Sequence, residues 1–144
     1  MQDIEKELKK RLKDGWIKAL MYFEVLSLEE SFAKEVLESH IQKLEKLQNV
    51  LVYKKEFGEI KKVQSPAHKD KVAYSTIVKV ELIAASYESL FFVTINYGPS
   101  SVEIIEPQTI KLDMWQAQGV LNSVSDMMHR FAAQGAGGII LQKV

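Results

Sequence analysis

The chain has 144 residues, 47% of them hydrophobic and 26% charged, and its basic and acidic side chains balance at 19 each. This length is typical of one domain with its own core, and these proportions argue against a disordered protein, so we expect a single domain over residues 1–144. The absence of cysteine excludes disulfides, thiolate catalysis and cysteine-bound zinc. The charged amino terminus and the lack of a long apolar run predict a cytoplasmic protein with no membrane partner.

The amino-terminal quarter predicts a short helix followed by a strand. Apolar residues recur every four positions at Ile4, Leu8 and Leu12, and this leading helix is expected to end at Asp14-Gly15. From Trp16 to Leu26 the period changes to two, as it does along a strand. One side of that strand is apolar throughout, with Ile17, Ala19, Met21, Phe23 and Val25.

A long amphipathic helix is predicted over residues 28–48. Ser27 and Glu30 have the S-x-x-E spacing of a capping box, in which both side chains satisfy amide donors at a helix start. Apolar residues then repeat at three and four positions and predict one buried face, made of Phe32, Val36, Leu37, Ile41, Leu44 and Leu47. Asn49 follows, where a left-handed residue would end the helix.

Residues 50–107 are rich in Val, Ile, Tyr, Phe and Thr and are interrupted by turn residues. This punctuation predicts four strands, over residues 50–63, 71–85, 88–97 and 101–106. Their short connections cannot make parallel crossovers, so we expect an antiparallel meander.

A second amphipathic helix is predicted after Asp113, which offers an N-cap. Its apolar face contains Ala117, Val120, Leu121, Val124, Met127, Met128 and Phe131. Three glycines after Gln134 would stop this helix. Residues 139–141 would then add a short strand or pack as a tail.

The predicted fold class is α+β, with an antiparallel sheet of β-α-β4-α order packed on two amphipathic helices behind the short leading helix. This element order resembles the TATA-binding-protein-like and helix-grip folds, in which a curved sheet wraps a carboxy-terminal helix. It also resembles small uncharacterised archaeal-type families. The resemblance covers roughly residues 16–134 and rests on element order without a motif, so it implies no functional residue. The alternative is a ferredoxin-like sandwich with an extra hairpin, which would use residues 139–141 as its last strand.

We find no catalytic, metal-binding or cofactor-binding set in the sequence, and we expect no enzyme, metal or cofactor. His40, His68 and His129 are not spaced as metal ligands, and Asp126 lies three residues before His129 without a nucleophile to activate. The strand glutamates Glu24, Glu81, Glu103 and Glu106 alternate with apolar residues, which is typical of a solvated sheet face. The glycine cluster after Gln134 follows a helix, whereas a phosphate loop precedes one.

One segment is locally basic. The candidate basic patch contains Lys54, Lys55, Lys61, Lys62, Lys69 and Lys71. Nucleic-acid binding usually needs a basic footprint over a whole domain, so nucleic acid is an unlikely partner and any such affinity should be weak.

The other side of the first strand carries more apolar residues than a solvated face should. With residues expected on the meander, it forms a candidate interface of Trp16, Leu20, Tyr22, Ile77 and Phe92, with Ile83 and Leu90 as further candidates. Such a patch normally marks a partner surface, unless the leading helix covers it. We therefore expect a homodimer, or an unknown protein partner, at this face.

The carboxy-terminal helix indicates a second way to bind. Its methionines face the apolar side of the first strand, and methionine tolerates varied guests, so a cavity lined by Met21, Phe23, Val124 and Met128 could hold an apolar small molecule. The plain alternative is a solid core. The leading interpretation is therefore a non-enzymatic binding or assembly domain, followed by a hydrophobic-ligand binder and then by a weak nucleic-acid contact.

Overall fold

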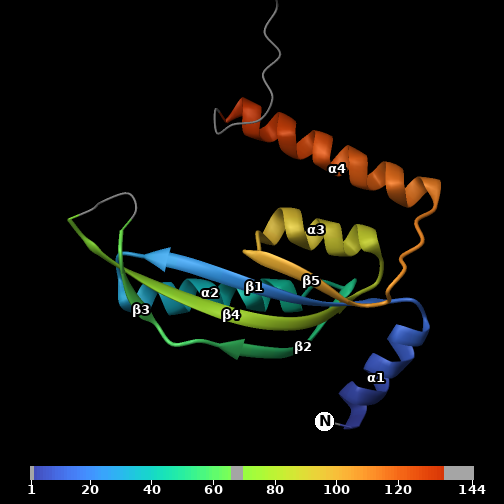
Figure 1. Ribbon diagram of the computed structural model, residues 1–144, viewed down its shortest axis with the longest axis horizontal. Coiled ribbons are helices and arrows are strands. Elements are labelled where there is room, and N and C mark those ends of the chain that lie inside the picture. The colour runs from blue at the N-terminus through green and yellow to red at the C-terminus, as the bar shows by residue number, and fades with distance from the viewer. Residues whose placement is uncertain (1, 66–69, 135–144) are drawn as a thin grey trace, which may run out of the picture. The chain divides into compact units, whose positions relative to one another are not determined.

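The computed structural model describes residues 2–65 and 70–134 (Figure 1). In chain order these residues form α1 (Gln2–Lys13), β1 (Ile17–Ser27), α2 (Glu30–Glu45), β2 (Val50–Phe57), β3 (Lys61–Gln64), β4 (Val72–Ala84), α3 (Tyr87–Tyr97), β5 (Ser101–Glu106) and α4 (Met114–Ala133). The predicted α+β class with an antiparallel sheet is therefore confirmed.

The chain divides into two compact units, Met1–Thr109 and Ile110–Val144. The first contains the whole sheet with α1, α2 and α3, and the second contains α4. The expected single domain over residues 1–144 stays a prediction.

The sheet runs β2-β4-β1-β5, with β3 paired to β4. Each pairing is antiparallel, and Met21 at the middle of β1 lies opposite Val80 of β4 and Val102 of β5. Strands β2 and β3 occupy successive stretches of the same side of β4, because β2 pairs with its second half and β3 with its first. They therefore act as one interrupted edge strand.

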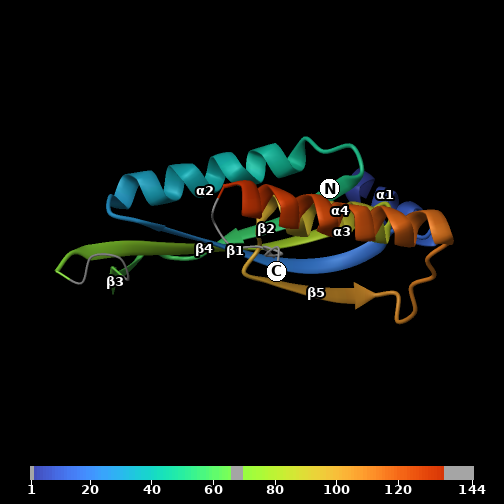
Figure 2. The ribbon, with the colours of Figure 1, turned by 90° about the horizontal axis from the view of Figure 1, so that it is seen from above.

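Two crossovers connect the strands, and this connectivity explains the layers. Counting β2 and β3 as one strand, the order is β-α-β-β-α-β, the split β-α-β arrangement of ferredoxin-like sandwiches. Crossovers of the same hand place α2 and α3 on one face of the sheet (Figure 2). The ferredoxin-like alternative thus describes the connectivity of the described residues, in which the last strand is Ser101–Glu106. Residues 139–141, which that alternative used as its last strand, lie outside the described residues.

The core lies between α2, α3 and the inner face of the sheet. Alternate residues of β1 point into it, as predicted, and their partners on β4 do the same, which gives Ile17, Ala19, Met21, Phe23, Val78, Val80, Leu82 and Ala84. The helices contribute Ala33, Leu37, Ile41, Leu44, Leu90 and Val93. His40 of α2 ties the two helices together, since its Nε2 lies 2.7 Å from the carbonyl of Tyr97, in the last turn of α3.

The predicted strand over residues 88–97 is wrong, because this segment forms helix α3. Ser86 caps the helix by accepting a hydrogen bond from the Ser89 amide at 3.1 Å, and Gly98 ends it in a left-handed conformation with φ 58°. The buried residues Leu90 and Val93 are three apart, which is helical spacing. The aromatic and β-branched residues of this segment favoured a strand in the prediction. Their preference for strands is only an average over many proteins, and it does not decide a single segment.

The predicted strand over residues 50–63 is broken at residues 58–60. The Gly58 amide donates to the Ile77 carbonyl at 2.8 Å. A Cβ added at Gly58 would lie 3.0 Å from the Ile77 side chain and 3.3 Å from its carbonyl oxygen, so a larger residue there would make Ile77 shift by a few tenths of an ångström.

Three predictions about the ends of α2 are also corrected. The predicted capping box does not form: Ser27 is the last residue of β1, its hydroxyl accepts from the Glu29 amide at 3.1 Å, and the N-cap is Glu29. Phe32, expected in the buried face, is 55% exposed, because α2 turns Ala33 toward the sheet instead. Asn49 is not left-handed, since every described residue with positive φ is glycine.

The ends of the other two helices agree with the predictions. α1 is followed by Gly15 at φ 96°. α4 begins with a capping box in which Asp113 accepts from the Gln116 amide at 2.8 Å, and it ends at the C-cap Gln134. Among the described residues, no helix has the length and apolar character needed to span a bilayer.

Candidate functional site

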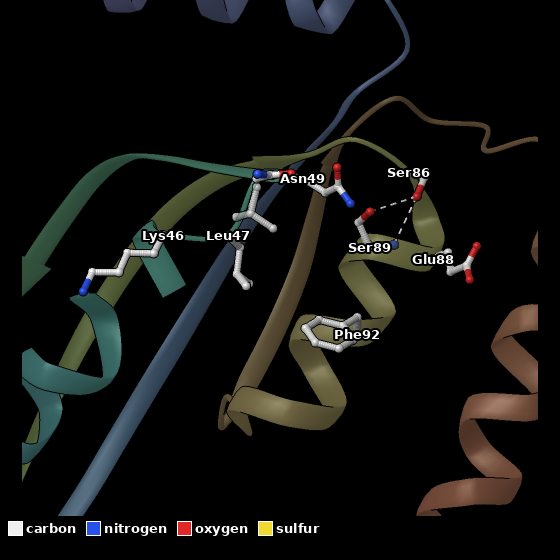
Figure 3. Close-up of a pocket in the computed structure, with 9 residues that line it drawn as sticks. Lys46, Leu47, Asn49, Ser86, Glu88, Ser89 and Phe92 are labelled. Carbon is white, nitrogen blue, oxygen red and sulfur yellow. Dashed lines mark hydrogen bonds between the residues drawn. The ribbon is translucent and has the colours of Figure 1, made fainter. Parts of the chain in front are cut away.

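A groove opens where the end of α2 meets the start of α3 (Figure 3). Its volume is about 660 Å³, and it is lined by Lys46, Leu47, Gln48, Asn49, Val50, Ser86, Glu88, Ser89 and Phe92. The Ala85 amide donates to the Asn49 carbonyl at 2.9 Å and holds the two walls together. The α2–β2 connection therefore forms one wall and the first turns of α3 form the other.

The groove offers binding contacts of mixed character. Phe92 is 50% exposed, so its ring presents apolar surface. The hydroxyls of Ser86 and Ser89 lie 3.1 Å apart, and Figure 3 shows the Lys46 side chain directed away from them. In the part of the chain that the structure describes, the hydrogen bonds of these two hydroxyls join them to each other and to the Ser89 amide, and not to a basic side chain that would activate a nucleophile. This arrangement can hold an amphipathic molecule by apolar and hydrogen-bonding contacts.

The outer face of the sheet is the second candidate site. In Figure 2, α2 and α3 lie on the opposite face, and no helix of the first unit covers this one. Leu20 and Tyr22 of β1 are half-buried here, and Ile77 of β4, beside Glu24, is 38% exposed. The structure therefore brings three of the five candidate interface residues onto one open face.

The other two candidate interface residues lie elsewhere. Trp16 precedes β1 and lies beneath the Arg11 guanidinium of α1, whose carbon is 4.5 Å from the ring centre. The leading helix thus covers Trp16. Phe92 is on α3 and lines the groove, because its segment is a helix and not a strand. Of the further candidates, Leu90 is in the core and Ile83 is fully buried on the outer face between Lys18 and Leu51.

A tyrosine hydroxyl with unusual surroundings lies beside the outer face. The Tyr53 hydroxyl is shielded from solvent and has no hydrogen-bond partner among the described residues, although its ring is partly exposed. Burial raises the pKa of Tyr53 to about 12, and the negative charges of Glu81 and Glu106 add to this shift. The Lys18 ammonium lies 5.7 Å from the ring centre. Sequence reasoning missed this residue, because no local pattern marks it.

The lysines of the candidate basic patch follow the sheet edge and do not share a face. Neighbouring residues of a strand point to opposite sides, so Lys54 and Lys55 diverge. Lys54 pairs with Glu81 at 3.7 Å, and Lys55 pairs with Glu45 at 2.8 Å. Lys61 and Lys62 are exposed on β3, Lys71 precedes β4, and Lys69 lies outside the described residues. Two of the lysines are thus partly neutralised.

The remaining candidates show structural roles or stay untested. The His129 Nδ1 lies 2.8 Å from the carbonyl of Ser125 in its own helix, and His68 lies outside the described residues. No cluster of three metal-binding side chains is found in residues 2–65 and 70–134. Met21 and Phe23 belong to the core of the first unit, whereas Val124 and Met128 lie on α4, which has no buried residue. The predicted cavity between them stays a prediction.

Among the outer-face carboxylates, Glu24 accepts from the Ser75 hydroxyl at 2.8 Å, and Glu81 pairs with Lys54. Glu103 and Glu106 are exposed on β5. These glutamates lie on a solvated surface, as their alternation with apolar residues predicts.

The sequence pattern of one protein family matches residues 18–142, which covers β1 to α4 and therefore both units. The chain belongs to the MJ0538 family. This membership supports the expected resemblance to a small archaeal-type family. No curated protein and no solved structure matches the chain. α1 lies outside the match, whereas the groove and the outer sheet face lie within it.

Proposed function

We propose that this MJ0538-family chain is a non-enzymatic binding and assembly domain that forms a homodimer through the outer face of its sheet. The observation that supports this proposal is the lack of a helix over that face within the first unit, although Leu20, Tyr22 and Ile77 are on it. Full burial of an exposed side chain of this kind recovers roughly 1.5–3 kcal/mol, and these partly buried residues would each recover part of that. A twofold axis would place each copy's patch against the other and double that gain.

The polar residues of the face are compatible with such a contact. Glu81 lies opposite Leu20, and Lys79 lies opposite Tyr22, so both signs of charge surround the apolar centre. Two sheets that pack face to face keep their strand directions within about 30° of each other. In a symmetric pair, the two sheets can be shifted so that side chains of like charge do not face each other. The dimer would therefore have an apolar centre and a polar rim.

The test is the mass of the chain in solution, measured by sedimentation equilibrium. The monomer has a mass of 16.4 kDa, so the native protein should sediment at twice that value. Tyr22→Lys should halve the measured mass and leave the circular dichroism spectrum unchanged. Phe32→Lys is the matched control, because Phe32 is 55% exposed on α2, away from the outer face. A native protein that is monomeric at high micromolar concentration would overturn the proposal.

A second candidate function, binding of a small apolar molecule, is supported by the groove at the start of α3. The exposed Phe92 ring would contact the ligand. A ligand that binds only the folded state raises the melting temperature. We expect Phe92→Ala to abolish that rise for any ligand found in a thermal-shift screen, while Phe32→Ala should leave it unchanged.

A further inference from the structure

The two edges of the sheet differ in how they are protected against pairing with another strand. The edge formed by β2 and β3 is interrupted at residues 58–60 and carries Lys54, Lys55, Lys61 and Lys62. Breaks in the strand and edge lysines are devices by which natural sheets prevent pairing at an edge. The lysines of the candidate basic patch thus have a structural explanation, which is protection of this edge.

The opposite edge, formed by β5, has no lysine and no break, and its register with β1 shifts once, between Ile104 and Glu106. Within residues 2–65 and 70–134, β5 pairs with β1 on one side only and ends the sheet (Figure 1). Its sequence, Ser101–Glu106, contains no lysine and no proline, and all six residues are exposed. A strand with one free side presents a row of unpaired amide and carbonyl groups, which an additional extended strand satisfies.

The side chains of β5 indicate which strand would fit. Val102 and Ile104 lie opposite Met21 and Ala19, so they point to the face that α2 and α3 occupy, yet they are 38% and 41% exposed. Glu103 points to the outer face. Opposite charges across neighbouring strands stabilise the pair, and like charges destabilise it. Two copies of β5 centred on Glu103 would bring the two Glu103 carboxylates together.

We propose that the β5 edge binds an extended segment of a partner protein by strand addition, with basic side chains opposite the β5 glutamates and apolar side chains opposite Val102 and Ile104. Main-chain hydrogen bonds hold the segment in register, and the alternating side chains select it. This inference does not require the homodimer, because the main-chain groups of the β5 edge lie in the plane of the sheet and not on its outer face.

The test uses the full chain and a short dye-labelled peptide that alternates valine with lysine and has blocked ends. Fluorescence anisotropy should show saturable binding, about tenfold tighter than for a valine–glutamate peptide. Methylating alternate peptide nitrogens should abolish binding, since it removes the main-chain donors. Glu103→Lys should reverse the preference between the two peptides. Glu56→Lys, on the protected edge, should leave it unchanged.

Three outcomes would overturn the proposal. Equal binding of the methylated peptide would show that strand addition is not involved. An unaltered preference in Glu103→Lys, with an unchanged circular dichroism spectrum, would place the peptide elsewhere. If the mass in solution is halved in Ile104→Lys but keeps the native value in Tyr22→Lys, the β5 edge binds a second copy of the chain. Peptide binding by Tyr22→Lys, the variant expected to be monomeric, tests the β5 edge without the outer-face dimer, so the two proposals fail independently.

Discussion

At the scale of single residues, burial separates side chains that neighbour each other in sequence. Leu44 is fully buried against the sheet, whereas Lys46, two residues later, is exposed at the helix C-cap. His40 has a structural role in place of a chemical one, since its ring nitrogen satisfies a carbonyl at the end of α3.

Leu44→Asp should unfold the first unit, because a buried carboxylate without a partner costs several kcal/mol of a typical total of about 5–15 kcal/mol. Lys46→Ala should change the free energy of unfolding by less than about 0.5 kcal/mol. Urea unfolding followed by circular dichroism measures both changes. Cooperative unfolding of Leu44→Asp at the native midpoint would show that the buried face of α2 is assigned wrongly.

Tyr53 should make stability depend on pH in the alkaline range. Its pKa is raised from 10.0 to about 12, so between these values the unfolded chain loses the phenol proton while the folded chain keeps it. The free energy of unfolding is therefore unaffected by this group below pH 10 and falls as the pH rises toward 12. Tyr53→Phe should remove that part of the slope in urea unfolding at a series of pH values. Identical slopes in both proteins would contradict the assignment.

At the scale of elements, helix ends decide where strand-like sequence becomes a helix. α3 contains Tyr, Phe, Val, Thr and Ile, yet it is bounded by an N-cap serine and a left-handed glycine. These two residues satisfy groups that a helix leaves without partners at its ends. The segment between the N-cap serine and the C-cap glycine is therefore a helix, although its interior residues prefer strands on average.

Ser86→Ala should destabilise the protein by about 1 kcal/mol, because it removes the acceptor for the Ser89 amide at the start of α3. Ser31→Ala is the control, since Ser31 is exposed in the first turn of α2 and should show no loss. Thermal unfolding of both variants gives the comparison. Equal midpoints for Ser86→Ala and the native chain would mean that the cap contributes nothing.

At the scale of the whole molecule, the distribution of charge bears on which partners fit. The net charge is zero, and the lysines of the candidate basic patch alternate between faces along one edge. A phosphate backbone needs cations converging on one surface. The β5 edge, in contrast, carries glutamates and open main-chain groups and suits an extended basic and apolar segment.

Any affinity for nucleic acid should be weak and should vanish near physiological salt, because few lysines can displace counterions together. The double charge reversal Lys61→Glu and Lys62→Glu should remove the affinity for nucleic acid that remains at low salt. Anisotropy of a labelled duplex across a salt series measures this. Tight binding at about 200 mM salt that survives the double reversal would require another basic surface.

Local patterning was sufficient for the elements whose apolar period is unbroken. β1 alternates at two, α2 and α4 repeat at three and four, and Asp113 caps α4, so their type and approximate bounds follow from neighbours along the chain. The α+β class follows from the same elements. The leading helix was recognised in the same way, with Gly15 as its end.

Only the tertiary structure decided which segments lie side by side. The order β2-β4-β1-β5 depends on crossovers that skip a strand, and no local pattern records which strand is skipped. Ile77 approaches Gly58 from a different strand, and the raised pKa of Tyr53 depends on its burial and on Glu81 and Glu106, which are distant in the sequence. The unequal protection of the two edges likewise became visible only when β5 and β2 were placed at opposite ends of the sheet, because an edge is a property of pairing.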